Sequence, residues 1–367
     1  MIDSPKRLGG ARTAVEFLGN KQRLVPFLLG AMSPTLRVGQ RVVDLFCGTG
    51  SVSAAFKSVG AHVEASDHML WCSLYTRSLL KNSGAPTFSG IKEVLRSRND
   101  QHPYEQTLAL LNRLEPVEGF VYRSYSPASV SFSGVKRMYF TQENAGRIDA
   151  IRRAIAEWRD YLTEAEAALL ISDLLRASAQ VSNVAGTYGC FLKDWKPRAL
   201  GQLILRPATF QAGPASHHTI HCRDAEELAG EIDAPVVYAD PPYTKRQYAA
   251  YYHLLETIAV GDEPDVVGAT GLRPWQDRSS DWCYRRKAPN ALRRLLSRLR
   301  RVRHFFLSYN EDGQISHDEV LAILGAHGVV QVLEVPIRRY KSSRRQHRGA
   351  LVTERLYHLR LQGRGTL

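Results

Sequence analysis

Short apolar runs that end in a polar residue alternate with amphipathic segments near the start of the chain. The run Val42–Phe46 (VVDLF) opens into a glycine turn, an apolar-patterned segment covers 52–59, and a second run, AHVEASD, ends at Asp67. Strand, glycine turn, helix and strand form the opening unit of an open parallel sheet. A further helix, predicted at about 69–81, should pack on this sheet.

This alternation stops at about residue 83 and returns after about residue 213. Between these positions apolar residues recur at spacings of three and four, which predicts one stripe of an amphipathic helix, at Ile148, Ile151, Ile155, Trp158 and Leu162. Thr163 and Glu166 have the spacing of a capping box and predict the start of a second helix. Residues 83–213 are therefore expected to form a mainly helical insertion.

The strand pattern returns in five runs: HTIHCRD, PVVYADPPY, RHFFLSYN, VVQVLEVPI and RLYHLRL. The sheet thus begins before the insertion and is completed after it. We predict the α/β class, with a doubly wound, mostly parallel sheet. The expected domains are residues 1–82 with 214–367 as one α/β unit, and 83–213 as the insertion.

Composition places the chain among water-soluble globular proteins. Hydrophobic residues make up 44% of its 367 residues, enough for a large core. No window approaches the roughly 20 apolar residues of a membrane helix, and the N-terminus has no apolar signal region. Five scattered cysteines favour a reducing, cytoplasmic location, at Cys47, Cys72, Cys190, Cys222 and Cys283.

The formal net charge of +13, from 49 basic and 36 acidic residues, favours a polyanionic partner. Nine Arg or Lys and no acid lie between Tyr284 and His304, and six lie between Ile337 and Arg348. Solvated helix faces and a loop are one interpretation of these two basic runs. Contact with nucleic-acid phosphates is the other, and we favour it because both runs follow the chemical motifs below.

The turn after the first strand has features of a nucleoside site. Gly48 and Gly50 lack Cβ atoms, so the backbone can turn sharply and approach a ligand. Asp67 ends the next strand, where a carboxylate can accept hydrogen bonds from ribose hydroxyls. A dinucleotide motif would have glycine where Ser53 stands, and Asp44 would repel a pyrophosphate but attract a sulfonium or ammonium group. These residues favour S-adenosylmethionine over NAD; a tight turn without a ligand is the alternative.

The stretch YADPPYTKRQY places an acid before two prolines and an aromatic ring. Asp240 stands at the carboxyl end of a strand, where open α/β sheets bind ligands. Pro241 and Pro242 remove two backbone donors but keep their carbonyl acceptors. The Asp240 carboxylate and the Pro241 carbonyl could accept both N–H groups of an exocyclic base amine, while Tyr243 stacks on the base. Such a site is too narrow for a duplex, so the base must be flipped out.

These motifs resemble those of the Dam-like (class alpha) adenine-specific DNA N6-methyltransferases. DPPY resembles the catalytic motif of that family, and DLFCGTGS its cofactor loop. Further similar segments are FLGNKQRLVPFL, VKRMYFTQENAGRIDAIRRAI and LSYNEDG. The matches recur along most of the chain, with least coverage at about residues 83–130 and in the last thirty.

The resemblance implies a methyltransferase fold, S-adenosylmethionine as cofactor, duplex DNA as substrate and no metal. Lys21 matches the lysine near the methionine end of the cofactor, Asp67 the ribose acid, and Asp224 the acid at the adenine ring. The implied site residues are Asp240, Pro241, Pro242 and Tyr243 for catalysis, and Lys21, Asp44, Phe46, Cys47, Gly48, Gly50, Asp67 and Asp224 for the cofactor. Some relatives carry an aromatic ring where this chain has Ala225, which leaves the adenine contacts open.

The resemblance also implies that the insertion recognises the target and that a cognate restriction endonuclease is a candidate partner. Structured RNA, the N4 amine of cytosine, and a non-catalytic nucleic-acid-binding module remain alternatives. A cytosine ring-carbon methyltransferase would need a Pro-Cys nucleophile motif, which the sequence lacks. The segment SHHTIHC could suggest zinc, but strand alternation would divide its histidines between two faces.

Overall fold

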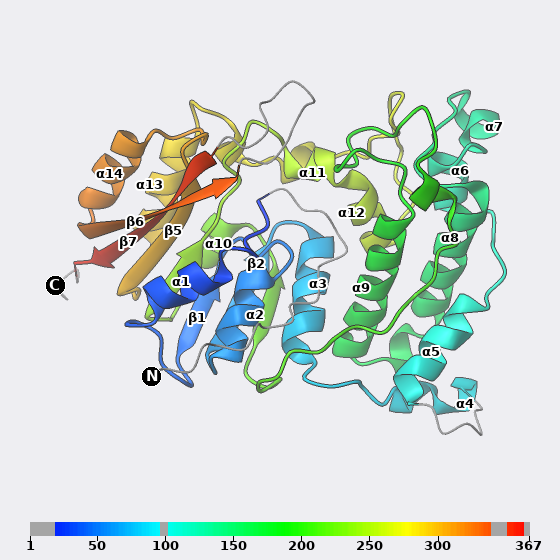
Figure 1. The fold of residues 1–367 in the computed structure, drawn as a ribbon, viewed down its shortest axis with the longest axis horizontal. Helices are drawn as coiled ribbons and strands as arrows, with labels where there is room; N and C mark the ends of the chain where they lie inside the picture. Colours follow the sequence, from blue (N-terminus) through cyan, green and yellow to red (C-terminus); the bar gives the residue numbers. More distant parts are fainter. Residues whose placement is uncertain (1–18, 96–101, 339–350, 363–367) are drawn as a thin grey trace.

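One seven-stranded sheet organises the computed structural model, which describes residues 19–95, 102–338 and 351–362. The strand order is β3-β2-β1-β4-β5-β7-β6 (Figure 1). The strands are β1 Arg41–Asp44, β2 His62–Asp67, β3 Thr219–Cys222, β4 Val236–Ala239, β5 His304–Asn310, β6 Gly328–Arg338 and β7 Leu351–Leu361. Strands β1 to β5 pair in parallel, and β7 runs antiparallel to both β5 and β6. The predicted mostly parallel α/β sheet is confirmed.

Helices cover both faces of this sheet because successive strand residues point to opposite sides. Val42 packs with α1 (Val25–Met32) and α2 (Ser51–Ser58), whereas its neighbour Val43 packs on the opposite face. The helices of that opposite face are α10 (Ala225–Ala229), α13 (Ala288–Arg298) and α14 (His317–Gly325). The sheet is therefore doubly wound, and its central strands are buried on both faces.

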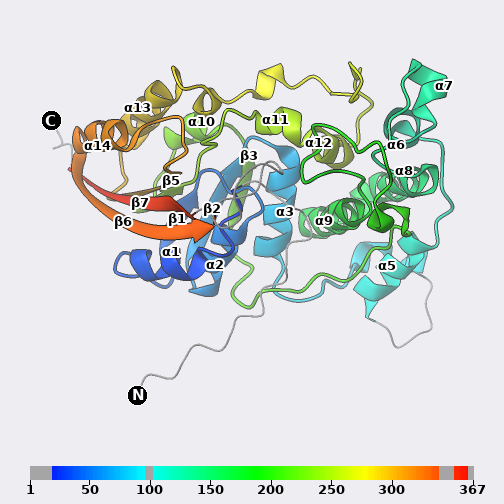
Figure 2. The same cartoon turned by 45° about the horizontal axis from the view of Figure 1, so that its top comes forward.

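A separate group of helices lies beside the sheet, on the right in Figure 1, and Figure 2 shows the same separation. It consists of α4 (Lys92–Leu95), α5 (Pro103–Asn112), α6 (Phe120–Tyr125), α7 (Ser129–Ser133), α8 (Gln142–Glu157), α9 (Glu164–Gln180), α11 (Tyr248–Tyr251) and α12 (His253–Val260). Short 3-10 turns occur at Ser89–Ile91, Arg159–Tyr161, Pro197–Leu200, Gln276–Arg278 and Asp281–Cys283. The helix α3 (Leu70–Lys81) packs against both β2 and α9, so it joins this helical group to the sheet.

The predicted helix pair within residues 142–180 is present, with one difference at the first helix end. The capping box at Thr163 and Glu166 is complete, which confirms the predicted start of α9. Ile148, Ile151 and Ile155 are buried along α8, as the stripe predicted. The helix ends at Glu157, however, and a 3-10 turn follows, so Trp158 and Leu162 continue the apolar stripe outside α8.

The first basic run does not form a single surface. Residues 284–287 are exposed and directly follow Trp282, which lines the cavity described below. Arg294, in the middle of α13, forms ion pairs with Glu226 and Asp281. Arg303 donates its backbone N–H to Pro235, directly before β4, so this end of the run lies at the amino edge of the sheet. Most of the second basic run lies outside the described residues.

None of the helices in the described ranges is long and apolar enough to cross a membrane.

A buried lysine closes the carboxyl end of α3. The Lys57 ammonium, from α2, donates to the carbonyls of Leu79, Leu80 and Asn82 at 3.0, 3.0 and 2.8 Å. The last carbonyls of a helix have no partner within the helix and carry partial negative charge, so a cation stabilises them. Burial lowers the pKa of Lys57 to about 8. Lys57 thus fixes the two helices that follow β1 and β2 relative to each other.

We predict that Lys57→Met destabilises the fold by about 2–4 kcal/mol, because three buried carbonyls lose their donor. Urea denaturation followed by circular dichroism measures the change in the free energy of unfolding. Lys92→Met, at an exposed lysine of α4, is the matched control and should change this free energy by less than about 0.5 kcal/mol. Equal effects of the two variants would contradict the role given to Lys57.

Candidate functional site

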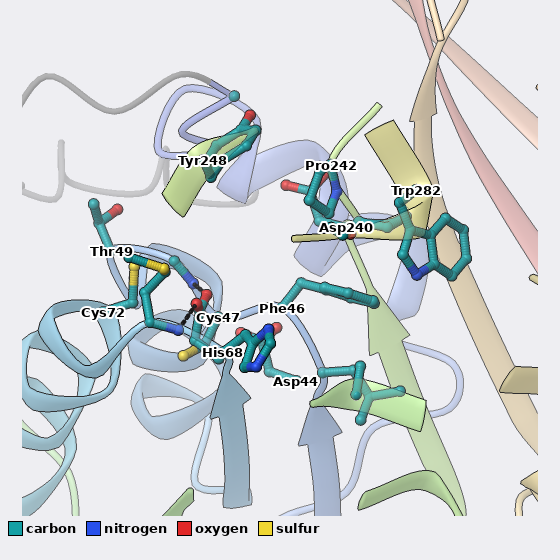
Figure 3. Close-up of a pocket in the computed structure, with 18 of the residues that line it drawn as sticks. Asp44, Phe46, Cys47, Thr49, His68, Cys72, Asp240, Pro242, Tyr248 and Trp282 are labelled. Atoms are coloured by element: carbon teal, nitrogen blue, oxygen red, sulfur yellow. Dashed lines mark hydrogen bonds between the residues drawn. The ribbon is translucent and has the colours of Figure 1, made fainter. Parts of the chain in front are cut away.

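A cavity opens at the carboxyl edge of the sheet, between the ends of β1, β2 and β4. It encloses about 1030 Å³ of empty space, part of it open to solvent. All of the predicted catalytic and cofactor residues line this cavity, with the exception of Gly50. In Figure 3, Tyr248 and Trp282 lie on opposite sides of the space, with Asp240 and Pro242 between them.

The glycine turn is held against the end of β2. Gly48 has a left-handed φ of 49°, and its N–H donates to the Asp67 carboxylate at 2.9 Å. Met69 donates its N–H to the other carboxylate oxygen of Asp67, also at 2.9 Å. Burial raises the pKa of Asp67 above its ordinary value. Asp67 therefore fixes the turn as well as facing the cavity.

Gly50 has a packing role. Its φ is +71°, and a Cβ atom at this position would lie 2.7 Å from the Thr76 hydroxyl and 3.2 Å from the Thr76 Cα, both in α3. The sequence pattern grouped Gly50 with the cofactor residues, but its free side faces a helix. The glycine is needed because the turn and α3 approach each other closely.

We predict that Gly50→Ala destabilises the fold more than Gly39→Ala does. Both glycines have positive φ, and nothing lies within 4 Å of a Cβ at Gly39. Backbone strain should therefore cost each variant about 1–2 kcal/mol, while the contact with Thr76 adds about 1–3 kcal/mol to Gly50→Ala alone. Urea denaturation of both variants measures the difference. Equal losses of unfolding free energy in the two variants would show that α3 can shift away from the added methyl group without an energetic cost.

Asp44, at the end of β1, has an unsatisfied carboxylate oxygen. Its Oδ2 accepts a hydrogen bond from the Ser53 hydroxyl at 2.6 Å, which explains the serine in place of a third glycine. Its Oδ1 is buried and has no hydrogen-bond donor within the described part of the chain. Burial raises the pKa of Asp44 to about 7. A buried acceptor in the cavity wall is suited to a cationic or N–H-bearing ligand.

Asp240, just beyond β4, belongs to a buried group of three charges. The Lys21 ammonium lies 3.0 Å from Asp240 Oδ1 and 2.8 Å from Glu354 Oε1. The Lys21 side chain is 4% exposed and the Glu354 side chain 1% exposed. Burial disfavours the Lys21 charge, but the two carboxylates outweigh this effect and raise the pKa of Lys21. Both carboxylates therefore share one buried cation.

Glu354 was not among the residues predicted from the sequence. In the structure, Ser308 and Asn310 of β5 donate to the two oxygens of Glu354, at 2.7 and 3.1 Å. Asn310 lies opposite Glu354 in the antiparallel pairing of β5 with β7. The available signal was polar side chains inside two apolar strands, in LSYN and in LVTERLYHL. Such residues are buried only when they have partners.

Aromatic rings line part of the cavity. Phe46 and Trp282 meet edge to face, with ring centroids 5.6 Å apart. The Tyr243 ring has the Lys21 ammonium 5.0 Å from its centroid and packs edge to face on Tyr309. Trp282 comes from the 3-10 turn before α13 and was not predicted. Rings that line a cavity can stack on planar groups such as nucleobases.

Asp224 and Ala225 lie at the start of α10 and also line the cavity. The Asp224 carboxylate caps that helix, since its Oδ1 accepts the backbone N–H of Glu226 at 2.8 Å. Ala225, where some similar proteins carry an aromatic ring, presents only a methyl group, and the large ring of Trp282 lies in the same cavity lining. The cavity therefore keeps an aromatic surface despite the small side chain.

A second ion pair connects the cavity to the helical group. Glu256 of α12 accepts the backbone N–H groups of Leu70 and Trp71, both at 3.1 Å, and pairs with Arg278. Arg278 lines the cavity and donates to the carbonyl of His68 at 3.3 Å. A carboxylate at a helix N-terminus satisfies free N–H groups and the helix dipole. Glu256 thus holds the start of α3 beside the loop after Asp67.

The zinc alternative finds no support among the residues that the structure describes, which contain no cluster of three His, Cys, Asp or Glu suited to a metal. His218 accepts a hydrogen bond from Val63 N–H at 3.0 Å, and its other ring nitrogen contacts the carbonyl of Pro214. His221 is paired with Glu64. These histidines hold β3 and the segment before it against β2.

A doubly wound sheet with a glycine turn, an acid at the end of β2 and a DPPY segment after β4 is typical of α/β domains of the methyltransferase type. Comparison with known families agrees. The sequence model of the D12 class N6 adenine-specific DNA methyltransferases matches residues 17–315. The chain belongs to this family, and the resemblance noted in the sequence is confirmed.

Several characterised proteins are similar over most of the chain. Type II methyltransferase M.FokI of Planomicrobium okeanokoites is 34% identical over 92% of this chain and 51% of its own length. Modification methylase StsI of Streptococcus sanguinis is 32% identical over 89% and 49%. Type II methyltransferase M.NlaIII of Neisseria lactamica is 34% identical over 83% and 85%. The chain thus spans about half the length of the first two relatives and most of the third.

Proposed function

We propose that this protein transfers a methyl group from S-adenosylmethionine to the exocyclic N6 amine of an adenine flipped out of duplex DNA. The observation that carries the proposal is the Asp240 carboxylate, whose side chain is 14% exposed, beside Pro241 and Tyr243 in the same cavity as the glycine turn. Family membership supports adenine and DNA as the substrate class.

The cavity wall fits the proposed cofactor at several points. Asp44 offers an unsatisfied acceptor to the ammonium or sulfonium charge, and Asp67 ends the neighbouring strand, where it can accept from the ribose hydroxyls. Phe46 and Trp282 offer ring surface for the adenine moiety. When bound, the cofactor supplies an electrophilic methyl group. Lys21, which the resemblance assigned to the methionine end, acts in this proposal through Asp240.

The target amine would be activated only by hydrogen-bond acceptors. The Asp240 carboxylate and the Pro241 carbonyl accept its two N–H groups, which favours a pyramidal nitrogen with its lone pair free for the methyl group. Tyr243, whose hydroxyl pKa burial raises to about 12, stays neutral and can stack on the base. The low dielectric of the buried site strengthens each of these interactions.

Contact with DNA would come from basic side chains at the carboxyl edge of the sheet. Arg285, Arg286 and Lys287 are exposed and follow Trp282 of the cavity wall. We propose that residues 1–82 and 214–367 form the catalytic unit and that 83–213 supply target recognition. A cytoplasmic modification role beside a cognate endonuclease is also proposed, since StsI carries the name modification methylase.

We predict that Asp240→Ala lowers the rate of methyl transfer by about 100-fold or more, because the amine loses a charged acceptor. Transfer of radiolabelled methyl groups to unmethylated duplex DNA measures the rate. Cofactor affinity, measured by calorimetry, should change little. Asp233→Ala, at an exposed aspartate three residues before β4, is the matched control and should retain the rate. Full activity of Asp240→Ala would refute the mechanism.

We predict that the logarithm of the association constant for duplex DNA falls linearly with the logarithm of the salt concentration. The triple variant Arg285→Gln, Arg286→Gln and Lys287→Gln should reduce the magnitude of this slope by about 2–3, since each lost phosphate contact contributes about 0.9. Arg300→Gln, Arg301→Gln and Arg303→Gln form the matched control at the amino edge and should leave the slope unchanged. Fluorescence anisotropy with labelled duplexes measures both.

The same titration with structured RNA tests whether the substrate is DNA or RNA. Tighter binding and faster methylation of RNA would replace DNA by RNA in the proposal. Methylation of cytosine N4 in product analysis would replace adenine. A protein that binds nucleic acid but neither binds the cofactor nor transfers a methyl group would be a non-catalytic binding module.

A further inference from the structure

Asp240, Lys21 and Glu354 form a buried charge triad, in which two carboxylates face one ammonium. They come from three places in the chain: the end of β4, the segment before α1, and β7. The Lys21 ammonium lies 2.8 Å from Glu354 and 3.0 Å from Asp240. Because one cation cannot neutralise two carboxylates, the triad carries one net negative charge in a poorly hydrated place when both acids are ionised.

The triad is not symmetric. Glu354 receives Lys21, the Ser308 hydroxyl and the Asn310 amide, so both of its oxygens have donors. For Asp240, the contact within the described part of the chain is the Lys21 ammonium, 3.0 Å from its Oδ1. Glu354 therefore shares the Lys21 charge with Asp240 and holds two further donors that Asp240 lacks.

The titration of the two acids follows this geometry. Burial opposes the charge of Glu354, but Lys21, Ser308 and Asn310 outweigh it and lower the pKa of Glu354. Burial raises the pKa of Asp240 to about 7; Lys21 opposes this shift and Glu354 adds to it. The negative charge of the triad thus rests on Glu354 first.

We propose that Glu354 is a positioning residue for methyl transfer: by holding Lys21, it leaves the Asp240 carboxylate available to the target amine. This inference rests on the proposed function. Without Glu354, Lys21 would have Asp240 as its remaining carboxylate partner. Their existing contact at 3.0 Å would then hold the ammonium more strongly against the acceptor that the amine needs.

The arrangement also provides for the proton that the reaction releases. As the bond from N6 to the methyl carbon forms and the bond from sulfur to that carbon breaks, N6 becomes positively charged. One N6 proton then passes to an oxygen of Asp240, and N6 returns to neutral. A carboxylate that binds a proton near neutral pH is a better acceptor than an ordinary aspartate. Glu354 would therefore raise the basicity of Asp240 as well as its availability.

Other ionisable groups around Asp240 must be distinguished in any test. They are Lys21 before α1, Glu354 on β7, Asp44 on β1, Tyr238 on β4, Tyr243 beyond β4 and Tyr248 on α11. Burial raises the pKa of each of these tyrosines, so they stay neutral near pH 7. Asp44, with a pKa of about 7, titrates in the same range as Asp240.

Infrared titration of the full chain without added ligand tests the proposal. The carbonyl stretch of protonated Asp240 is assigned by its loss in Asp240→Asn, and that of Asp44 by its loss in Asp44→Asn. In the wild-type protein the Asp240 band should titrate near pH 7. In Glu354→Gln its midpoint should fall by about one pH unit or more, because a cation without a competing carboxylate favours the ionised form.

Two further variants separate charge from structure. Glu354→Met is also uncharged and avoids placing an amide nitrogen against the Asn310 amide; it should give the same fall in midpoint. Ser308→Ala removes one hydrogen bond to Glu354 and keeps all three charges, so it should lower the thermal unfolding temperature with little change in the midpoint. The pH profile of kcat/KM should follow: its acid limb moves to lower pH in Glu354→Gln and stays in place in Ser308→Ala.

The outcomes are distinct. An unchanged Asp240 midpoint in the folded Glu354 variants would overturn the proposal. So would a wild-type Asp240 that titrates in the ordinary aspartate range, a measurement that needs no Glu354 variant to fold. An absence of methyl transfer by the wild-type protein would defeat the proposed function instead, while the infrared midpoints still decide whether Glu354 controls Asp240.

Discussion

The site depends on the parallel pairing of β1 with β4. In that register Asp44 lies beside Tyr238, two residues before Asp240. Two acids that are far apart in the sequence therefore meet at one edge of the sheet, the glycine turn on one side and the prolines on the other. A slip of one residue would reverse which side chains face each helical layer, so the packing of Val42 and Val43 on opposite faces also fixes the chemistry.

This arrangement has an energetic cost. Burial raises the pKa of both Asp44 and Asp240 to about 7. Each acid therefore lowers the free energy of unfolding progressively between about pH 4 and 7, where the unfolded chain is already ionised and the folded chain is not. Lys21 offsets part of this cost through its ion pair with Asp240. Its other partner, Glu354, accepts hydrogen bonds from Ser308 and Asn310. Groups held in unfavourable ionisation states are typical of sites that bind or transform a ligand, and both Asp44 and Asp240 line the cavity.

The sequence allowed prediction of the residues that end strands, because Asp44, Asp67 and Asp240 are marked by local patterns of apolar runs and turns. It did not allow prediction of Glu354, because the position of β7 between β5 and β6 is a property of the whole sheet. The basic run at 284–304 looked continuous because periodicity does not show that α13 carries it from one edge of the sheet to the other. Gly50 was grouped with ligand contacts because its partner, Thr76, lies in another helix.

Helix α3 connects the helical group to the cavity at the edge of the sheet. It begins just after Asp67, its first N–H groups are held by Glu256, and its last carbonyls are held by Lys57. The same helix packs against α9 of the helical group. Displacement of the helical group would therefore move the loop that contains Asp67, which holds the glycine turn. Arg278 is paired with Glu256 and lines the cavity, so it would move as well. If residues 83–213 read the target, as proposed, the correct sequence can influence the cavity through this helix, since its two ends are fixed by buried charges that resist independent movement.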